Sequence, residues 1–342
     1  MKWHSWMMVF RLLATFKSKR LRHSSFCGTR SVSGMDVDHY EGRGKVVGTL
    51  IFIHGMSLLG REDPRIAHFS EALALAGYRV LVPDFPSIRR LDIEKGQSEE
   101  ILGQLELLVS DHSLVPDSFG LITVSFSGVF ALLAACRSGL ASRLFGICLV
   151  GSYSDIFSVS SFSVLANRSD HYGKLIILRN YYREVEPEEI QLRTVLDRCI
   201  SECAVQNVWN PDVALDQSKY VEGRVHSMLT DLDERRELAS RLANLFKENW
   251  SEYQINLDFL HRDIPVLLIH GRHDRIVPAG ESKKLARNLI DRGIPTWLCV
   301  TQLLSHGDSE LRLSKWIEVF RLLQAFAWFF HAHKQHARGR KD

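Results

Sequence analysis

Long uncharged apolar runs are lacking in this chain of 342 residues. A helix that spans a bilayer needs about 20 consecutive apolar residues, so we expect a protein that is not integral to a membrane. Internal repeats and low-complexity linkers are lacking too. With 45% apolar and 24% charged residues, the composition is typical of a globular protein, and one large domain with an insertion would account for the whole length.

Cysteine pairs of the CxxC type are also missing. Cys199 and Cys203 are four residues apart and would share one face of a helix, but no histidine or further cysteine nearby completes a zinc site. We therefore expect reduced thiols and no metal site. The full set of cysteines is Cys27, Cys136, Cys148, Cys199, Cys203 and Cys299.

A strong positive charge is missing from most of the chain. The formal net charge is +3, yet residues 1–34 contain seven Lys or Arg and no acidic residue. The remaining residues therefore have a net charge of −4, which is the total of +3 less those seven charges. A body of this charge is not expected to bind nucleic acid.

The first residues combine apolar and basic side chains in an amphipathic pattern. Apolar residues recur at helical spacing within residues 3–16, and four basic residues follow within residues 17–22. This pattern is similar to a membrane-surface helix or a transit peptide, which predicts peripheral membrane contact through residues 3–22. Arg11 interrupts the apolar core that a secretory signal needs. The alternatives are a disordered tail and a start of synthesis at Met35. We expect a cytoplasmic protein, or a membrane-associated or mitochondrial one if the segment is a targeting peptide.

Apolar runs of strand length alternate with helical patterns along the chain. The strand-like runs are residues 46–53, 78–82, 119–124, 144–150, 265–269 and 296–301. The helical patterns are residues 64–76, 98–108, 128–136, 282–290 and 313–330. Runs that are apolar nearly throughout are typical of strands covered on both faces. The alternation predicts an α/β fold with a doubly wound, mostly parallel sheet.

The chain is expected to divide into a core and an insertion. Residues 155–262 are richer in charge and in helical patterns, which predicts an inserted helical cap. The core would comprise residues 44–154 and 263–331, between basic tails at residues 1–43 and 332–342. Aromatic residues gather near the start of the cap, where they either form its own core or line an acyl or aromatic substrate pocket. They are Tyr153, Phe157, Phe162, Tyr172, Tyr181 and Tyr182.

Ser125 lies where the run 119–124 gives way to the helical pattern 128–136. Here the sequence resembles the α/β-hydrolase superfamily, whose members place a serine nucleophile on a sharp strand-to-helix turn with the pattern G-x-S-x-G, the nucleophile elbow. Thr123 and Ser127 replace the two glycines. Ser127 is a small substitute, whereas the β-branched Thr123 would alter the turn or narrow the site. Two alternatives stay open: Ser127 as the nucleophile, and a serine pair that only caps the helix.

The resemblance also implies an acid and a base that complete a catalytic triad. Asp274 follows a strand-like run as the acid of the superfamily does, and Asp155 is a rival acid after an earlier strand. His306 lies in the loop after the last strand-like run, where members of the superfamily carry the catalytic histidine. A serine hydroxyl is a poor nucleophile near neutral pH, so it needs an imidazole to accept its proton and a carboxylate to orient that imidazole.

Backbone donors for the developing oxyanion are implied by the resemblance alone. The candidates for this oxyanion hole are the N–H groups of Met56 and Phe126, and His54 is expected to brace the loop. The resemblance thus implies a serine hydrolase of the carboxylesterase or lipase-like type. It would cleave a carboxylic ester, or a thioester or amide, of a small or lipid-like acyl compound through an acyl-enzyme on Ser125, without a cofactor. The alternatives are a catalytically inactive binding protein with this fold and an acyltransferase with the same triad.

Overall fold

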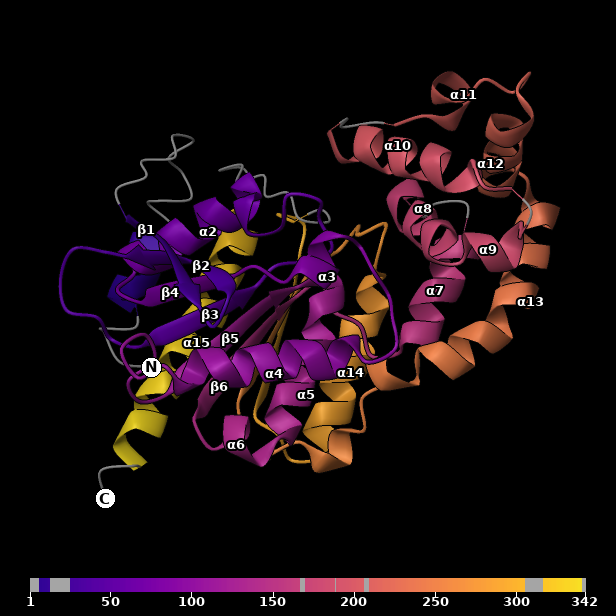
Figure 1. Ribbon diagram of the computed structural model, residues 1–342. Helices are drawn as coiled ribbons and strands as arrows, with labels where there is room; N and C mark the ends of the chain where they lie inside the picture. The colour runs from indigo at the N-terminus through magenta and orange to yellow at the C-terminus, as the bar shows by residue number, and fades with distance from the viewer. Residues whose placement is uncertain are drawn as a thin grey trace.

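A central β-sheet organises the protein. The computed structural model describes residues 6–12, 25–166, 170–187, 189–205, 209–304 and 316–339. Within these residues the sheet has eight strands in the order β1-β2-β4-β3-β5-β6-β7-β8 (Figure 1). The strands are β1 (Phe26–Val32), β2 (Met35–Glu41), β3 (Thr49–Ile53), β4 (Arg79–Pro83), β5 (Phe119–Val124), β6 (Leu144–Val150), β7 (Val266–Gly271) and β8 (Thr296–Thr301).

The strands from β3 to β8 are all parallel to one another. At one edge, β2 pairs antiparallel with β4, and β1 pairs antiparallel with β2. Every residue of β3 and β7 is buried, because helices cover both faces of a parallel sheet. The predicted doubly wound, mostly parallel sheet is confirmed.

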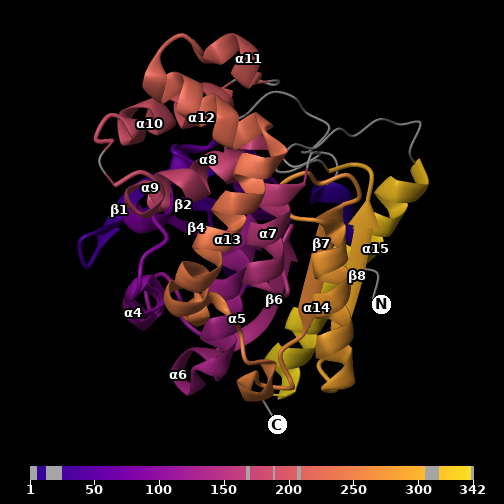
Figure 2. The same ribbon diagram turned by 90° about the vertical axis from the view of Figure 1, so that its right-hand side faces the viewer.

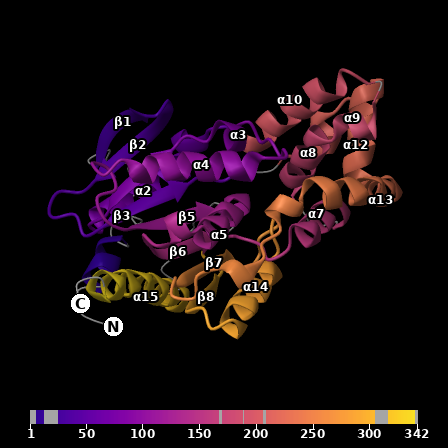
Figure 3. The same cartoon turned by 60° about the horizontal axis from the view of Figure 1, so that its bottom comes forward.

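Helices form a layer on each face of the sheet, and Figure 3 shows α4 and α15 on opposite sides of it. The face that carries Phe52 packs against α2 (Pro64–Leu75), α15 (Trp316–Gly339) and the helical segment 6–12. The face that carries Ile51 packs against α4 (Gln97–Ser110), α5 (Gly128–Cys136) and α14 (Ala279–Asp291). Short helical turns are η1 (Gly60–Glu62), α3 (Pro86–Arg89), η2 (Ser125–Ser127) and α6 (Ser138–Ala141).

Local sequence signals begin and end α2. The carboxylate of Asp63 accepts a hydrogen bond from the backbone N–H of Arg65, and Pro64 occupies the first helical position. Gly77 follows the helix with a φ of 112°, in the left-handed region that glycine adopts at little cost. These capping signals are the reason why the sequence predicts the bounds of this helix to within one residue.

The cap consists of the helices between β6 and β7, which form a lobe beside the sheet in Figure 1. They are α7 (Ile156–Leu165), α8 (His171–Asn180), α9 (Tyr182–Val185), α10 (Leu192–Val205), α11 (Pro211–Ala214), α12 (Tyr220–Thr230), α13 (Leu232–Asn249), η3 (Ser251–Tyr253) and η4 (Leu257–Phe259). The aromatic residues near the start of the cap have different surroundings. Tyr181 accepts a hydrogen bond from the indole N–H of Trp250 inside the cap, whereas Tyr153 and Tyr172 line the pocket described below.

The N-terminal part of the fold begins earlier than residue 44. Strands β1 and β2 form an antiparallel hairpin that extends the sheet, and Met35 and Val37 are buried in its core. The helical segment 6–12 buries Met8, Val9 and Leu12 in the core on the face of the sheet that carries Phe52. The pattern of residues 1–43 predicts only a tail or an amphipathic segment, because six of the seven residues of β1 keep some exposure and carry no apolar alternation.

The C-terminal helix also extends beyond its predicted end. α15 continues to Gly339, past residue 331, where the sequence predicts the start of a basic tail. His333 is 6% exposed, and its Nδ1 atom lies 3.3 Å from the hydroxyl oxygen of Tyr78. Its ring centroid lies 4.1 Å from that of Phe145. The packing of this polar residue in the core ties the last turns of α15 to the sheet.

Candidate active site

Ser125 lies at a sharp turn between β5 and α5. Its φ is 58°, in the left-handed region that residues with a Cβ atom seldom adopt. Backbone strain of this kind gathers at functional sites. Gly128 opens α5 directly behind the turn, where a Cβ atom would overlap the Oγ atom of Ser152. Glycine is therefore required for the close approach of the turn to the end of β6.

Ser127 lies in the same turn but faces the interior. It is fully buried, and its hydroxyl donates a hydrogen bond of 2.6 Å to the carbonyl oxygen of His54. It does not cap α5 with its side chain. Ser125 lines the pocket beneath the cap, and Ser127 does not. The geometry therefore favours Ser125 over Ser127 as the nucleophile, and it does not support helix capping as the role of Ser127.

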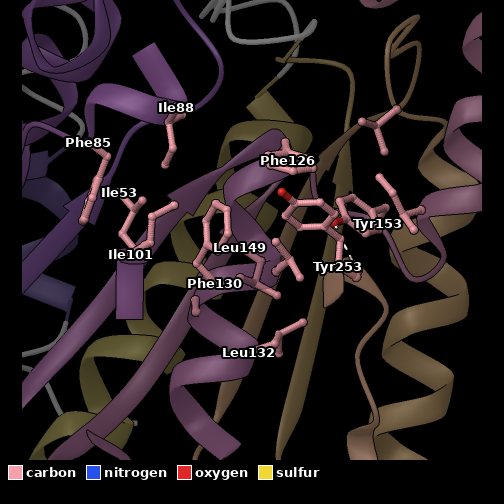
Figure 4. Packing of buried hydrophobic residues seen from close by; sticks show 14 of the residues in the cluster. Ile53, Phe85, Ile88, Ile101, Phe126, Phe130, Leu132, Leu149, Tyr153 and Tyr253 are labelled. Atoms are coloured by element: carbon pink, nitrogen blue, oxygen red, sulfur yellow. Dashed lines mark hydrogen bonds between the residues drawn. The ribbon is translucent and has the colours of Figure 1, made fainter. Parts of the chain in front are cut away.

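The pocket beside Ser125 is apolar and lies between the sheet and the cap. The space among its lining atoms is about 610 Å³, part of which is open to solvent. The lining residues are Met56, Ile93, Ser125, Phe126, Tyr153, Ile156, Val159, Ser160, Ser163, Tyr172, Gly173, Ile176, Ile177, Trp250, Ile276 and Val277. None of these side chains carries a charge. Figure 4 shows Phe126 beside Tyr153 and Tyr253, whose ring centroids lie 6.3 Å and 5.1 Å from that of Phe126.

Met56 and Phe126, the predicted oxyanion donors, line the same pocket as Ser125. The hydroxyl of Tyr172, on cap helix α8, donates a hydrogen bond of 3.1 Å to the carbonyl oxygen of Met56. A side chain of the cap thus holds the loop that carries one of the two candidate N–H groups. This contact could not be predicted from the sequence, because the two residues are 116 positions apart.

His54 braces this loop from the interior. It is fully buried, and its Nδ1 atom lies 3.0 Å from the carbonyl oxygen of Gly55, while its Nε2 atom accepts a hydrogen bond from the N–H of Phe85. Burial lowers the pKa of His54 below its usual value of 6.5. A neutral ring with its proton on Nδ1 satisfies both contacts, in agreement with the structural role expected for this histidine.

Asp274 follows β7 and is held by the backbone. Its Oδ1 atom accepts hydrogen bonds of 2.9 Å from the N–H groups of Ile276 and Val277, both of which line the pocket. Its side chain is only 3% exposed. Because β6 separates β5 from β7 in the sheet, Asp274 and Ser125 lie at the same edge, two strands apart.

The rival acid, Asp155, has a different role. It caps α7 by accepting hydrogen bonds from the N–H groups of Phe157 and Ser158, and its Oδ2 atom lies 3.5 Å from the Nζ atom of Lys284. It does not line the pocket that contains Ser125. These contacts favour Asp274 as the acid.

His306, the predicted base, lies outside the described residues. The described chain before it ends at Leu304, just after β8. Two of the described histidines near the strand ends, His54 and His270, are fully buried and hydrogen-bonded. His273, beside Asp274, is exposed. The role of His306 therefore stays a prediction from the resemblance.

None of the cysteines lines the pocket that contains Ser125. All six cysteines are free thiols, and Cys148, Cys199 and Cys299 are buried. In the part of the chain that the structure describes, no group of three His, Cys, Asp or Glu side chains is placed to hold a metal ion.

No protein-family model matches the chain, and no curated protein matches its sequence. A putative hydrolase from Legionella pneumophila matches in structure with a TM-score of 0.55 at 12% identity, covering 96% of this chain and 95% of its own. An open-form lipase matches with a TM-score of 0.50 at 15% identity, covering 88% and 99%. A putative esterase from Staphylococcus aureus matches with a TM-score of 0.50 at 12% identity, covering 92% and 88%.

One further neighbour is much longer than this chain. An acylaminoacyl peptidase from Pyrococcus horikoshii matches with a TM-score of 0.47 at 14% identity, covering 93% of this chain and 42% of its own. The chain therefore spans about two fifths of the length of that peptidase. The hydrolase and the lipase, with TM-scores of 0.55 and 0.50, together with the strand order, decide the fold.

The chain has the α/β-hydrolase fold. In open α/β sheets, ligands bind at the carboxyl ends of the parallel strands. In this α/β-hydrolase fold, Ser125 directly follows β5, and Asp274 lies in the turn after Gly271, the last residue of β7, which agrees with that rule.

A buried hydrogen-bond network joins the strand ends of the site, and the sequence did not reveal it. The hydroxyl of Ser282 donates to the carbonyl oxygen of Ser152 at 2.8 Å, and lies 2.7 Å from the Nδ1 atom of His270. The hydroxyl of Ser152 donates to the carbonyl oxygen of Ser125 at 3.4 Å. The network thus connects α14 and the ends of β5, β6 and β7. No motif marks these residues, since Ser152 and Ser282 are 130 positions apart.

Proposed function

We propose that the protein is a serine hydrolase that cleaves a carboxylic ester through an acyl-enzyme on Ser125. The observation that carries this proposal is the placement of Ser125 in a left-handed conformation at the turn between β5 and α5, facing an apolar pocket. An exposed serine hydroxyl on such a turn is the arrangement that α/β-hydrolase nucleophiles use. The enzyme names of the structural neighbours agree with this activity.

The proposed mechanism follows from the chemistry of acyl transfer. The Oγ atom of Ser125 attacks the ester carbonyl carbon while His306 accepts the hydroxyl proton, and Asp274 stabilises the imidazolium that forms. The N–H groups of Met56 and Phe126 donate to the oxyanion, and one such donor contributes about 3 kcal/mol to the transition state. The C–O bond of the ester then breaks, and His306 returns the proton to the leaving alcohol. Water then attacks the acyl carbon while His306 accepts its proton. The bond between that carbon and the Oγ atom of Ser125 breaks, and His306 returns the proton to Ser125.

The pocket favours an uncharged, apolar acyl group as the substrate part that it holds. None of its lining side chains carries a positive charge that would pair with a carboxylate or phosphate, and burying an unpaired charge in an apolar site is costly. Tyr153, Tyr172 and Trp250 provide aromatic surface at its walls. Thioesters and amides have the same acyl carbon and are the alternative substrates.

A fluorophosphonate probe and a chromogenic ester test the proposal together. We expect the full chain to be labelled and to hydrolyse the ester, and Ser125→Ala to lose both activities. Ser127→Ala is the matched control, because it makes the same serine-to-alanine change two residues away in the same turn. Its folding is checked by thermal unfolding, because it loses the hydrogen bond to His54. Labelling that persists in Ser125→Ala contradicts the proposal.

A binding protein without catalysis is the second candidate, and a specific observation favours it. Thr123 replaces a glycine of the superfamily pattern, is fully buried, and has no hydrogen-bond partner for its Oγ1 atom among the described residues. Equal and negligible probe labelling of the parent chain and Ser125→Ala, with retained binding of a fluorescent fatty ester, would assign that function. An acyltransferase would instead be labelled and would prefer an added alcohol over water.

A further inference from the structure

Exposed apolar side chains gather where the helical segment 6–12 meets the start of α15. Trp6 joins the two helices, since its ring centroid lies 5.8 Å from that of Phe320 and 6.3 Å from that of Phe10. We call the six residues involved the aromatic patch. They are Trp6, which is partly exposed, and Met7, Phe10, Trp316, Ile317 and Phe320, which are 39%, 55%, 68%, 50% and 47% exposed.

The aromatic patch is held in place by the core beneath it. The segment 6–12 buries Met8, Val9 and Leu12 on its inner side. The helix α15 likewise buries Phe326 and Phe330 against the sheet. Trp316, Ile317 and Phe320 share one face of α15, because residues four apart lie one above the other on a helix. The patch is therefore presented by two anchored helices.

Contiguous exposed apolar surface of this kind marks an interaction site. We propose that the aromatic patch docks the protein on an anionic lipid surface. Tryptophan and phenylalanine beside basic residues are typical of segments that lie in the membrane interface. The patch gathers three of the five Phe and Trp side chains that are strongly exposed in the described part of the chain.

The basic residues near the start of the chain favour an anionic lipid surface over a second copy of this chain as the partner of the aromatic patch. The exposed Arg11 is next to Phe10, and the sequence continues with basic residues at positions 17, 19, 20 and 22, while residues 1–34 contain no acid. Each basic residue near an anionic membrane adds about 1 kcal/mol of attraction. A second copy of this chain on the same patch would add another Arg11 and no acidic residue from positions 1–34, and like charges repel.

The aromatic patch and the pocket lie at the same end of the molecule. α15 follows β8 and starts at the carboxyl edge of the parallel strands, the edge at which Ser125 follows β5. Figure 2 shows the start of α15 at the same end as the cap. Docking through the patch therefore turns the end that contains the pocket towards the lipid. Among the described residues, no helix is long and apolar enough to cross a membrane.

Vesicle co-sedimentation of the full chain tests the proposal without any measurement of catalysis. The probes are vesicles of phosphatidylcholine alone and of phosphatidylcholine with phosphatidylserine in about a third of the lipid. We expect strong partitioning onto the anionic vesicles, which weakens in high salt because salt screens the attraction. Equal partitioning onto the two kinds of vesicle would overturn the proposal.

Two double variants distinguish membrane binding through the aromatic patch from binding through apolar surface elsewhere. Phe10→Ala combined with Trp316→Ala removes two side chains that are more than half exposed, so the fold should persist. We expect partitioning to fall by about tenfold or more, since each aromatic side chain buries a large apolar area. The matched control combines Phe259→Ala with Ile190→Ala, which are 70% and 85% exposed on the cap side of the chain. An equal loss in both double variants contradicts the patch.

Neutralising the basic segment is a second, independent change. Replacing Lys17, Lys19, Arg20 and Arg22 by Gln should weaken binding to anionic vesicles by roughly fivefold for each charge at low salt. Binding to anionic vesicles that is unaffected by these four changes would contradict the anionic lipid surface as the occupant. A concentration-dependent dimer in the absence of lipid, lost in the Phe10→Ala and Trp316→Ala variant, would assign the patch to a second copy and overturn the proposal.

Discussion

The Nε2 atom of His270 lies 3.5 Å from the Oδ2 atom of Asp274, with both side chains buried. The same Nε2 atom lies 2.8 Å from the carbonyl oxygen of Val277, which can only accept, so Nε2 carries a proton. The hydroxyl of Ser282 has one proton and two acceptors within reach, the Nδ1 atom of His270 and the carbonyl oxygen of Ser152.

This contact predicts that His270→Leu weakens both folding and catalysis. The carbonyl of Val277 and the hydroxyl of Ser282 lose a buried partner, so we expect the free energy of unfolding to fall by about 2 kcal/mol. The proposed acid Asp274 loses a neighbour that fixes its position, so the kcat for ester hydrolysis should fall as well. Urea unfolding and initial rates measure the two effects. His273→Leu, at an exposed position next to Asp274, should leave both unchanged, and equal behaviour of the two variants would refute the prediction.

Tyr172→Phe removes the hydrogen bond between the cap and the carbonyl oxygen of Met56 but keeps the aromatic ring. A hydrogen bond of this type contributes about 1 kcal/mol, so kcat for an ester should fall roughly fivefold while KM changes little. Steady-state kinetics with a chromogenic ester measures the change. Tyr182→Phe is the control, since its hydroxyl accepts from Arg183 on the outside of the cap. A larger change in KM than in kcat would indicate that Tyr172 acts in substrate binding.

Thr123→Val should stabilise the protein. The hydroxyl of Thr123 is buried without a hydrogen-bond partner among the described residues, and valine has nearly the same shape without the polar group. We expect the free energy of unfolding to rise by about 1 kcal/mol in urea titrations. Thr49→Val is the matched control on the neighbouring strand, where the hydroxyl donates to the carbonyl oxygen of Leu114. No gain from Thr123→Val relative to Thr49→Val would show that the Thr123 hydroxyl finds a partner in solution.

The lowered pKa of His171 predicts that the protein loses stability in acid. Burial lowers the pKa of His171 to about 4, and the positive charges of Lys174, Arg275 and Arg235 contribute, while Asp170 opposes them. The unfolded chain has the usual pKa of 6.5 at this residue, so it binds more protons than the folded protein between pH 6.5 and 4. Stability from this group is therefore present above pH 6.5 and is lost as the pH falls towards 4.

The variant His171→Phe isolates this contribution. Between pH 7 and pH 5, His171 should remove about 2 kcal/mol from the free energy of unfolding of the parent chain. The variant should lack that part of the decrease and keep the ring contact with Trp209. Chemical unfolding at the two pH values measures the difference. An identical pH dependence of both proteins would mean that His171 is protonated without cost in the folded state.

The parts of the fold that could be predicted from the sequence are those with strong periodic or capping signals. The nine residues of α5 match the predicted range 128–136, because an apolar helix follows directly on a buried strand. β1 was not predicted, because it is an edge strand whose residues are mostly exposed. In the site, the positions of Ser125 and Asp274 follow from the resemblance, whereas the contacts between distant residues depend on the order of the strands in the sheet.

In the proposed serine hydrolase, the hydrogen bond from Tyr172 to Met56 would make the reaction rate, as well as the affinity, depend on how well the acyl group fits the width of the pocket. A bulky acyl group that pushes α8 outwards would pull Tyr172 away from the loop, and the backbone N–H of Met56 would lose its support at the moment when negative charge develops. Oversized substrates could then bind well and still react slowly. Selection among acyl groups would therefore occur largely after binding. Acyl groups that displace α8 least would react fastest.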